Sequence, residues 1–479
     1  MIFERVVDLP ACIEACFAYH ERPAALKRLI PPWESVTILR SDNSLTPGSE
    51  VLLNSRILGL SLRWLARHET LERPKLFVDK QVYGPFSSWR HEHRFEPLEG
   101  NRTQLIDHVE YQLPFGRLGN LLGHSFIKRK LNAMFAYRHR LTRQDLEFGN
   151  AVASASPDFA GPKTIAVSGS HGLIGSHVVS LLSVLGHHVI RLERPSTRDK
   201  FATKKEVNHF ASATNRVTST VWNPQLGLAD PQLCDGIDAV IHLAGKGIAD
   251  QRWTTATKAD LVRSRVDATK LLSRQLSELP NPPKAFISAS GVGIYGNRGE
   301  VELEESESAN QDFLGQLAQR WEQAANPLAD CGSRVCFGRL GIVLSPKGGA
   351  LAKMLSLFRW ALGGRMGSGK QYWSWIGHED ASSAFVWLAL NSACHGPYNF
   401  VAGSMTNQDF TKCLATALSR PALLPVPDWA LRTAMGEMAD GLMLNSTRAL
   451  GNRLQSSGYP MRQTDLLQAM QELLGVQPT

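Results

Sequence analysis

The sequence has no long hydrophobic run. No segment reaches the roughly 18 consecutive apolar residues that a membrane span requires, and residues 1–10 carry charges where a secretory signal would need an apolar core. The seven cysteines are odd in number and lack the spacing of a disulfide framework. We therefore expect a soluble, cytoplasmic protein with reduced thiols and no integral membrane segment.

Charge of one sign is not concentrated anywhere in the chain. The net charge of +8 is spread over 479 residues, and no basic block or RNA-binding motif occurs. Basic residues between positions 128 and 140 are interpreted as the solvated face of a helix. Nucleic acid is therefore not an expected partner.

Internal repeats and extended low-complexity segments are also missing, and 43% of the residues are hydrophobic, which is typical of a globular protein. A length of 479 residues exceeds one hydrophobic core. Residues 151–162 are rich in alanine, serine and proline, as in a linker. The predicted units are therefore residues 1–150, 163–424 and 425–479.

The first unit has the pattern of an antiparallel sheet followed by a long helix. Turn residues separate five strand-like segments, Glu50–Ile57, Ser61–Glu69, Leu76–Tyr83, Trp89–Pro97 and Thr103–Gln112. Apolar residues then recur at helical intervals across Leu118–Gln144. This order predicts an α+β domain with a cavity between the sheet and the helix.

The second unit alternates strands with helices. The predicted strands are Thr164–Ser168, His188–Leu192, Ala239–Leu243, Ala285–Ala289 and Arg334–Leu344, and a helix is expected at Ile174–Leu185. This βαβ order predicts a parallel, doubly wound α/β sheet with helices on both faces. The third unit, from Pro425 onward, is expected to be a small helical subdomain.

A glycine-rich turn connects the first of these strands to its helix. Gly169, Gly172 and Gly175 stand where a side chain would obstruct a phosphate or the packing of helix on strand. The backbone of the whole turn, which includes Ser170, His171, Leu173 and Ile174, is therefore expected to bind a dinucleotide pyrophosphate.

The end of the second strand is expected near the adenosine ribose. Glu193 would favour NAD by binding the ribose hydroxyls, whereas Arg194 would favour NADP by pairing with a 2′-phosphate. The downstream cations Arg198, Lys204 and Lys205 either assist Arg194 or lie in a solvated loop. Both cofactors therefore remain open.

Together with Asp238–Gly245, this turn resembles the extended short-chain dehydrogenase/reductase superfamily. Further motifs resemble its atypical nucleoside-diphosphate-sugar epimerase-like family, and they are Gln251–Thr254, Ser264–Arg265, Ile287–Gly296, Asp312–Leu314, Gly348–Met354, Trp373–Ile376, Leu424–Pro427 and Gly436–Met438. The resemblance covers roughly residues 163–479 and implies an NAD(P)-binding Rossmann domain with Leu243, Ala244 and Gly245 over the cofactor. It also implies a substrate cleft formed by the C-terminal part.

The resemblance fails at the usual catalytic pair. Members of the superfamily use a Tyr-x-x-x-Lys motif, but this chain has Phe313 and Leu317 at those positions. Ser290, Ser288 and Tyr295 are the remaining catalytic candidates, with Ser290 preferred. A structural strand-end serine and a packed tyrosine are the alternative interpretations.

Basic and indole side chains form a second candidate group that could hold an anionic or planar substrate. Its members are Arg252, Trp253, Lys353, Arg365, Trp373 and Trp375. The alternative is that the tryptophans are core residues. Residues 377–380 depart from the family's more usual His-hydrophobic-Asp-Asp pattern, which leaves the contacts of that loop open.

The first unit resembles the START-like polyketide cyclase/dehydrase (SRPBCC) helix-grip family at Pro31–Glu34, Trp89–Phe95 and Asp107–Leu113. This resemblance implies an apolar small molecule or lipid in the cavity between sheet and helix. His91 and His93 share one strand face, but the sequence identifies no third ligand. We therefore expect them to line the cavity or make cross-strand contacts, and we predict no metal site.

These patterns together predict an α/β Rossmann domain with an N-terminal α+β helix-grip domain and a small helical C-terminal subdomain. The expected function is that of an NADP- or NAD-dependent epimerase or oxidoreductase acting on a small carbonyl or sugar-like substrate. The alternatives are a non-catalytic, nucleotide-responsive binding protein and a lipid or quinone carrier.

Overall fold

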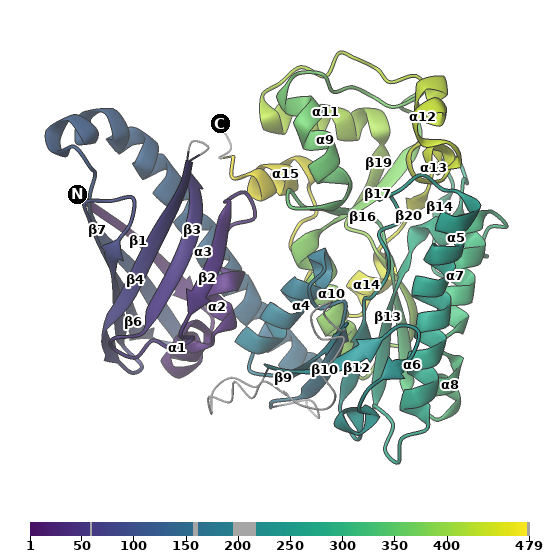
Figure 1. Ribbon diagram of the computed structural model, residues 1–479, viewed down its shortest axis with the longest axis horizontal. Helices are drawn as coiled ribbons and strands as arrows, with labels where there is room; N and C mark the ends of the chain where they lie inside the picture. Colours follow the sequence, from purple (N-terminus) through teal and green to yellow (C-terminus); the bar gives the residue numbers. More distant parts are fainter. Residues whose placement is uncertain (58–59, 157–160, 195–216, 477–479) are drawn as a thin grey trace.

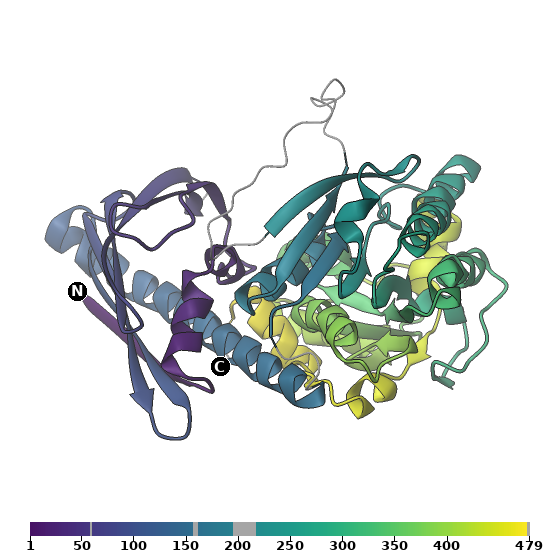
Figure 2. The same cartoon turned by 90° about the horizontal axis from the view of Figure 1, so that it is seen from below.

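The computed structural model describes residues 1–57, 60–156, 161–194 and 217–476. Figure 1 shows an N-terminal sheet beside a larger α/β part, and Figure 2 shows helix α3 (Gly116–Ala155) extending from the sheet to the flank of the larger part. The chain therefore has the predicted combination of an α+β domain and a Rossmann domain.

The N-terminal sheet is antiparallel and has seven strands in the order β1-β7-β6-β5-β4-β3-β2. The strands are β1 (Ile2–Leu9), β2 (Val36–Ser41), β3 (Glu50–Ile57), β4 (Leu60–Glu72), β5 (Leu76–Tyr83), β6 (Ser88–Leu98) and β7 (Arg102–Gln112). Helices α1 (Ile13–Glu21) and α3 pack against this sheet, and α2 (Ala24–Arg28) follows α1. The long helix and the sheet enclose the domain core, as the helix-grip resemblance implied.

The five strands predicted in this domain are all present, but β1 and β2 were not predicted. Charges at Glu4, Arg5 and Asp8 interrupt the apolar alternation of β1, so its sequence alone does not indicate a strand. Helix α3 also continues to Ala155, and residues 151–155 of the predicted linker are therefore helical. Burial of Val152, which is 6% exposed, explains why the helix does not stop at residue 150.

The Rossmann sheet has eight strands in the order β11-β10-β9-β8-β12-β13-β15-β18, and all its pairs except β10 with β11 are parallel. The strands are β8 (Thr164–Ser168), β9 (His188–Glu193), β10 (Val217–Asn223), β11 (Gly227–Leu228), β12 (Ala239–His242), β13 (Ala285–Gly291), β15 (Arg334–Leu340) and β18 (Gly396–Phe400). The strand order reverses between β8 and β12, and ligands of doubly wound sheets bind at such a switch point.

Helices cover both faces of this sheet. One face carries α4 (Leu173–Val184) and α10 (His378–Leu390), while the other carries α6 (Ala268–Ser277), α7 (Phe313–Gln323) and α8 (Asn326–Asp330). Helix α5 (Thr255–Val262) leads through a π-helical turn, η3 (Arg263–Asp267), into α6. In Figure 1, α5 to α8 lie along one side of the sheet and α4 and α10 along the other.

The predicted strand Arg334–Leu344 is divided into two strands that belong to different sheets. Strand β15 ends at Leu340, and β16 (Ile342–Leu344) joins a three-stranded sheet with β17 (Tyr372–Gly377) and β19 (Gly403–Thr406). Gly341 allows this change of direction, because a Cβ atom there would lie 2.7 Å from the carbonyl oxygen of Ser374. The prediction of one continuous strand was therefore wrong.

The C-terminal segment is largely helical and packs closely on this small sheet. It contains α12 (Asp428–Met435), α13 (Glu437–Ala439), α14 (Asn452–Ser456), α15 (Leu466–Leu474), the π-helical turn η5 (Asp440–Leu444) and β20 (Arg448–Ala449), which pairs with β14 (Glu302–Leu303). Helix α15 shares a hydrophobic core with α9 (Gly349–Arg359), α11 (Asn407–Leu418) and β17. Residues 425–479 are thus integrated with the preceding elements.

All seven cysteines are unpaired. Within the described residues, no helix combines the length and the apolar character needed to cross a membrane.

Candidate functional site

The glycine turn lies at the carboxyl edge of β8, beside the switch point. Gly169 has φ of +66°, and a Cβ atom there would lie 2.8 Å from the carbonyl group of Leu243. A Cβ atom on Gly175 would lie 2.1 Å from the carbonyl oxygen of Gly169. The turn is therefore pressed between β12 and α4, and its backbone N–H groups lie at the N-terminus of α4.

Side-chain contacts join the ends of β8 and β12. The Ser168 Oγ and His242 Nδ1 atoms are 2.7 Å apart, and the backbone N–H groups of Leu243 and Ala244 donate to the same Oγ at 3.1 and 3.3 Å. Burial lowers the pKa of His242 to about 4, so its imidazole is neutral. These contacts hold Leu243, Ala244 and the exposed Gly245 beside the glycine turn.

The predicted ribose-binding residues follow at the end of β9. The Glu193 Oε1 atom lies 3.5 Å from the Nε2 atom of His171, which belongs to the glycine turn and whose side chain is 71% exposed. Arg194 is exposed at the next position. The structure thus brings the glycine turn and both ribose candidates together, while Arg198, Lys204 and Lys205 lie outside the described residues.

Ser288 and Ser290 lie on β13, which neighbours β12. Ser288 is level with His242 in the strand register, is fully buried, and donates to the carbonyl oxygen of Ala289 at 3.2 Å. Ser290 lies two residues further toward the carboxyl edge and is 4% exposed. Its Oγ donates to Glu322 Oε1 at 2.7 Å.

Arg339 on β15 holds Glu322 from the other side. Its Nε and Nη2 atoms donate to the two carboxylate oxygens of Glu322, both at 2.9 Å. A two-pronged ion pair of this kind fixes the carboxylate in one orientation. Ser290 therefore has a partner, contrary to the sequence, which gave no sign of one.

Tyr295 also contacts Arg339, but on the side of β18. The tyrosine is fully buried, and its hydroxyl donates to Asn399 Oδ1 at 2.7 Å and accepts from Arg339 Nη1 at 2.9 Å. Burial raises the pKa of Tyr295, although Arg339 and Asn399 oppose that rise. This arrangement favours the packing role that the sequence left open as the alternative.

Phe313 occupies the position of the missing catalytic tyrosine, and its ring contacts another aromatic ring. Phe313 begins α7, and its ring lies 5.2 Å from that of Trp253. The Nζ atom of Lys258 is 4.9 Å from the centre of the Phe313 ring and forms an ion pair with Glu437 in the C-terminal segment. Leu317 is buried one helical turn further along α7.

Arg265 was missed as a candidate, although its motif was recognised. It lies in the π-helical turn η3, is 8% exposed, and donates from Nη2 to the carbonyl oxygen of Lys246 at 2.7 Å. Its guanidinium stacks 5.2 Å above the ring of Trp321, and burial lowers its pKa to about 10. π-Helical turns of this kind are frequent at functional sites. In the sequence, the signal that could have identified Arg265 was the Ser264–Arg265 motif.

The structure separates the second group of predicted substrate residues. Trp373 and Trp375 are core residues, with 4% and 1% exposure. Lys353 donates to the carbonyl oxygen of Ala249 at 2.6 Å. Arg252 Nη1 donates to the carbonyl oxygen of Thr433 at 3.4 Å. Trp253 and Lys353 thus contact the adjacent carbonyl groups of Ile248 and Ala249, and Arg252 contacts the C-terminal segment.

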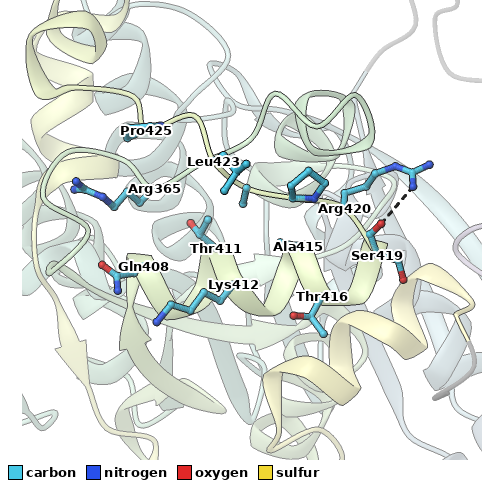
Figure 3. A pocket seen from close by; sticks show the side chains of 12 residues that line it. Arg365, Gln408, Thr411, Lys412, Ala415, Thr416, Ser419, Arg420, Leu423 and Pro425 are labelled. Carbon is cyan, nitrogen blue, oxygen red and sulfur yellow. Dashed lines mark hydrogen bonds between the residues drawn. The ribbon is translucent and has the colours of Figure 1, made fainter.

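Arg365, the last member of that group, lines a different cavity. This cavity has a volume of about 810 Å³ and lies between α11 and residues 419–425, as Figure 3 shows. Arg365, Lys412 and Arg420 contribute its cationic groups. Since no residue of the glycine turn lines it, this cavity is separate from the candidate nucleotide site.

Ion pairs connect the N-terminal domain to the α/β part. Asp145 on α3 is fully buried and binds Arg28, and it also binds Arg462 of the C-terminal segment at 3.1 Å. Arg140 on α3 contacts Glu379 at the start of α10, with 3.3 Å between Nη1 and Oε2. The expectation of a solvated basic face is therefore wrong near Arg140, because the neighbouring domain covers the helix there.

Comparisons with known proteins match three parts of the chain. The model of the family described as "NAD dependent epimerase/dehydratase family" matches residues 165–403. The model of a domain of unknown function matches residues 426–473. Residues 9–136 match "Polyketide cyclase / dehydrase and lipid transport". An epimerase family protein of Mycobacterium bovis is 36% identical over 307 residues, which are 64% of this chain and 96% of that protein. One from Bacillus subtilis is 34% identical over 66% of this chain and 99% of its own length.

Solved structures show the same relationship. A nucleoside-diphosphate sugar epimerase from Corynebacterium glutamicum is 28% identical, covers 99% of this chain and 90% of its own, and has a TM-score of 0.77. A human epimerase family protein solved with NADPH is 29% identical, covers 65% of this chain and 99% of its own, and has a TM-score of 0.56. The sequence, the strand order and these relatives agree that the chain belongs to the NAD dependent epimerase/dehydratase family, with an N-terminal polyketide cyclase/dehydrase domain.

Proposed function

We propose that the protein is an NADP(H)-dependent epimerase or oxidoreductase that acts on a small carbonyl or sugar-like substrate, with NAD(H) as the alternative cofactor. One observation carries the proposal: the glycine turn after β8 and Ser290 on β13 lie at the same edge of the sheet, with β12 between their strands and the switch point between β8 and β12. This is where a doubly wound sheet binds its ligands.

The residues present fit a dinucleotide. Gly169 and Gly175 leave no room for side chains, so the N–H groups at the start of α4 are accessible to a pyrophosphate. Glu193 or Arg194 would bind the ribose end, and Leu243, Ala244 and Gly245 would lie over the cofactor. Arg194 and the relative solved with NADPH support NADP(H). The nicotinamide group supplies a hydride acceptor or donor when bound.

The neighbouring side chains favour a polar substrate with an anionic group. The rings of Trp253 and Phe313 meet edge to face, at 67° to one another, and provide aromatic surface of the kind that packs against sugar rings. Arg265 lies beside Gly245 with its guanidinium over the ring of Trp321, and it has no carboxylate in ion-pair contact among the described residues. It would bind the anionic part of a substrate.

Ser290 is the group that we assign to the substrate oxygen. Its hydrogen is directed at Glu322, so its lone pairs can accept a hydrogen bond from a substrate hydroxyl. When that hydroxyl loses its proton, Ser290 can take it while passing its own proton to Glu322 Oε1. Ser288 and Tyr295 are fully buried, and we assign both to the scaffold.

The N-terminal domain would hold an apolar guest. Its interior contains Phe3, Trp89, Tyr111, Leu131 and Phe135, which form one apolar cluster between the sheet and α3. The match to a family described by lipid transport supports this role.

The test is a substrate panel assayed with NADPH and NADH, read by nicotinamide absorbance and by the isomer composition of the products. We expect turnover that Ser290→Ala abolishes. Ser273→Ala is the matched control, because Ser273 on α6 is also buried, but its hydroxyl donates to the backbone carbonyl oxygens of Lys270 and Ala324 instead of to a carboxylate. Tight cofactor binding without any turnover, or full activity in Ser290→Ala, would reject the proposal.

The ion pairs between the domains support a second candidate, a nucleotide-responsive binding protein. Helix α2 packs on α4, which begins at the glycine turn, and Arg28 on α2 is tied to Asp145. Cofactor occupancy would then change the exchange of backbone amide hydrogens in α2, whereas a simple lipid or quinone carrier would show no such change. Mass spectrometry of ligands retained after gentle purification would identify both guests.

A further inference from the structure

The inner face of the N-terminal sheet carries a cluster of imidazoles and carboxylates. His68 on β4, Asp79 on β5 and His91 on β6 are directly opposite one another in the strand register. His93 on β6 is opposite Asp107 on β7 in the same way. Because register partners point to the same face of a sheet, these side chains gather at one place beneath α3.

Three donor atoms of this cluster converge. The Asp79 Oδ2 atom lies 3.6 Å from His91 Nδ1 and 3.8 Å from His93 Nε2. All three donor atoms lie within 4.8 Å of one another. These separations are too long for hydrogen bonds. Ligand atoms around a tetrahedral zinc ion are about 3.3 to 3.4 Å apart, so small side-chain movements would close the site around an ion.

In both histidines, the ring nitrogen that faces away from Asp79 lies close to the carboxylate of Asp107. Asp107 Oδ1 forms a 2.9 Å hydrogen bond with His91 Nε2 and lies 2.7 Å from His93 Nδ1 in an ion-pair contact that lacks hydrogen-bond geometry. Histidines that bind a metal commonly direct the other ring nitrogen to a carboxylate, which fixes the ring orientation and raises the basicity of the ligand. His139 on α3 contacts the other oxygen of Asp107 and completes this support.

The surroundings match an ion site with an open position. The side chains of Asp79 and His93 are 17% and 14% exposed, whereas those of His91 and Asp107 are 3% and 4% exposed. The donors are thus reached from one side and supported from the other. Three protein donors leave a position for water or another ligand.

Two further observations point to a cation. The Nδ1 atom of His68, opposite Asp79, is buried and has no protein partner among the described residues. Such orphaned nitrogens are uncommon in folded proteins. In addition, Asp79 and Asp107 place two carboxylates around His91 and His93, and a divalent cation would offset the cost of burying them.

We propose that Asp79, His91 and His93 bind a divalent transition-metal ion of the zinc class inside the N-terminal domain, with Asp107 positioning both histidines. Two imidazole donors select zinc and its neighbours over magnesium and calcium, which prefer oxygen ligands. This site is separate from the nucleotide site of the α/β part, so neither proposal depends on the other.

Zinc binding by the full-length, chelator-treated protein tests the proposal. We expect one equivalent of Zn²⁺ by titration calorimetry and by metal analysis after dialysis, unaffected by excess Mg²⁺. Co²⁺ should give the intense visible bands of a four- or five-coordinate site, and Zn²⁺ should remove them. Substoichiometric binding, or Co²⁺ bands of a hydrated surface ion, would overturn the proposal without any variant.

Near-isosteric variants locate the ion. We expect Asp79→Asn and His93→Gln to weaken Zn²⁺ binding by more than tenfold, and Asp107→Asn to weaken it by about 10- to 100-fold with the stoichiometry retained. His108→Gln is the matched control, because His108 lies on the same sheet with Glu4 and Glu110 within 2.9 and 3.6 Å but outside the cluster. Circular dichroism confirms folding, and a folded Asp79→Asn protein that binds Zn²⁺ like the wild type refutes the assignment.

Discussion

The Ser290 hydroxyl donates a 2.7 Å hydrogen bond to Oε1 of Glu322, a carboxylate that Arg339 holds with two further hydrogen bonds. This contact gives a strand-end serine both an orientation and a proton acceptor. Under the proposed function, Glu322 would be a positioning residue, because it would act on the substrate only through Ser290.

Glu322→Gln tests that positioning role. The amide keeps the shape of the carboxylate but cannot accept the serine proton, so we expect kcat to fall by about 100-fold or more while KM changes little. The pH dependence of kcat should change as well. A purely structural role for Glu322 predicts a lower unfolding temperature with an unchanged pH profile, and that result would contradict the assignment.

For Tyr295→Phe we expect a loss of stability without a loss of activity. The buried Tyr295 hydroxyl forms hydrogen bonds with Asn399 Oδ1 and Arg339 Nη1. Because its removal would leave both groups without this partner, it should lower the free energy of unfolding by about 1–3 kcal/mol. The kcat/KM value should remain close to that of the wild type, since the hydroxyl is bonded away from the glycine turn. Chemical denaturation and steady-state kinetics measure the two quantities, and a large loss of kcat in a stable protein would restore Tyr295 as a catalytic residue.

The cofactor turn predicts a steric effect at Gly175. A Cβ atom there would lie 2.1 Å from the backbone oxygen of Gly169, and the turn would have to open. We expect Gly175→Ala to weaken NADPH binding by at least tenfold in a fluorescence titration. Ser180→Ala is the control and should bind normally, because Ser180 lies in the same helix and its hydroxyl donates to the Ser176 carbonyl oxygen. Equal affinities in the two variants would exclude this turn as the pyrophosphate site.

The adjacent residues Glu193 and Arg194 are expected to have opposite effects on the preference for NADPH or NADH. If Arg194 pairs with a 2′-phosphate, Arg194→Ala should weaken NADPH binding by about tenfold, equivalent to roughly 1.4 kcal/mol, and leave NADH binding nearly unchanged. Glu193→Ala should instead weaken NADH more than NADPH. Titration of both variants with both cofactors decides the preference, and an equal effect on the two cofactors would show that neither residue discriminates.

The sequence predicted those parts of the molecule that depend on local patterns. The glycine turn, its flanking strand and helix, and the alternation of strands with helices all follow from short-range periodicity and glycine spacing. Contacts between distant segments could not be predicted in this way. Asp79 meets His91 through strand register, and Glu322 meets Ser290 across a helix–sheet interface. A single sequence records neither relationship.

The same reasoning explains the error at Arg140, whose partner Glu379 is more than two hundred positions away in the chain. A basic residue on an amphipathic helix normally faces solvent, and only the packing of a second domain changes that expectation. The boundary of the linker was misplaced for a related reason, because burial of Val152 stabilises helix beyond the point where composition changes.

The Arg140–Glu379 pair predicts a stability that depends on pH. Burial alone would raise the pKa of Glu379, but Arg140, His378 and Arg462 lower it to about 2 from its ordinary value of 4.5. A carboxylate with a lowered pKa in the folded state stabilises the protein above its unfolded pKa and loses that effect as the pH falls toward the folded value. Ionised Glu379 thus contributes up to about 3 kcal/mol at neutral pH, and less as the pH falls from about 5 to 2.

Glu379→Gln should therefore lower the free energy of unfolding by about 3 kcal/mol at pH 7, with the difference from the wild type shrinking on acidification. Glu472→Gln is the matched control, because Glu472 contacts the same Arg140 Nη1 at 3.4 Å but is 22% exposed, and its effect should be below about 1 kcal/mol. Denaturant titrations at pH 7 and at pH 3.5 measure both differences. A Glu379→Gln effect of the same size at the two pH values would mean that shape, rather than charge, holds α3 against α10.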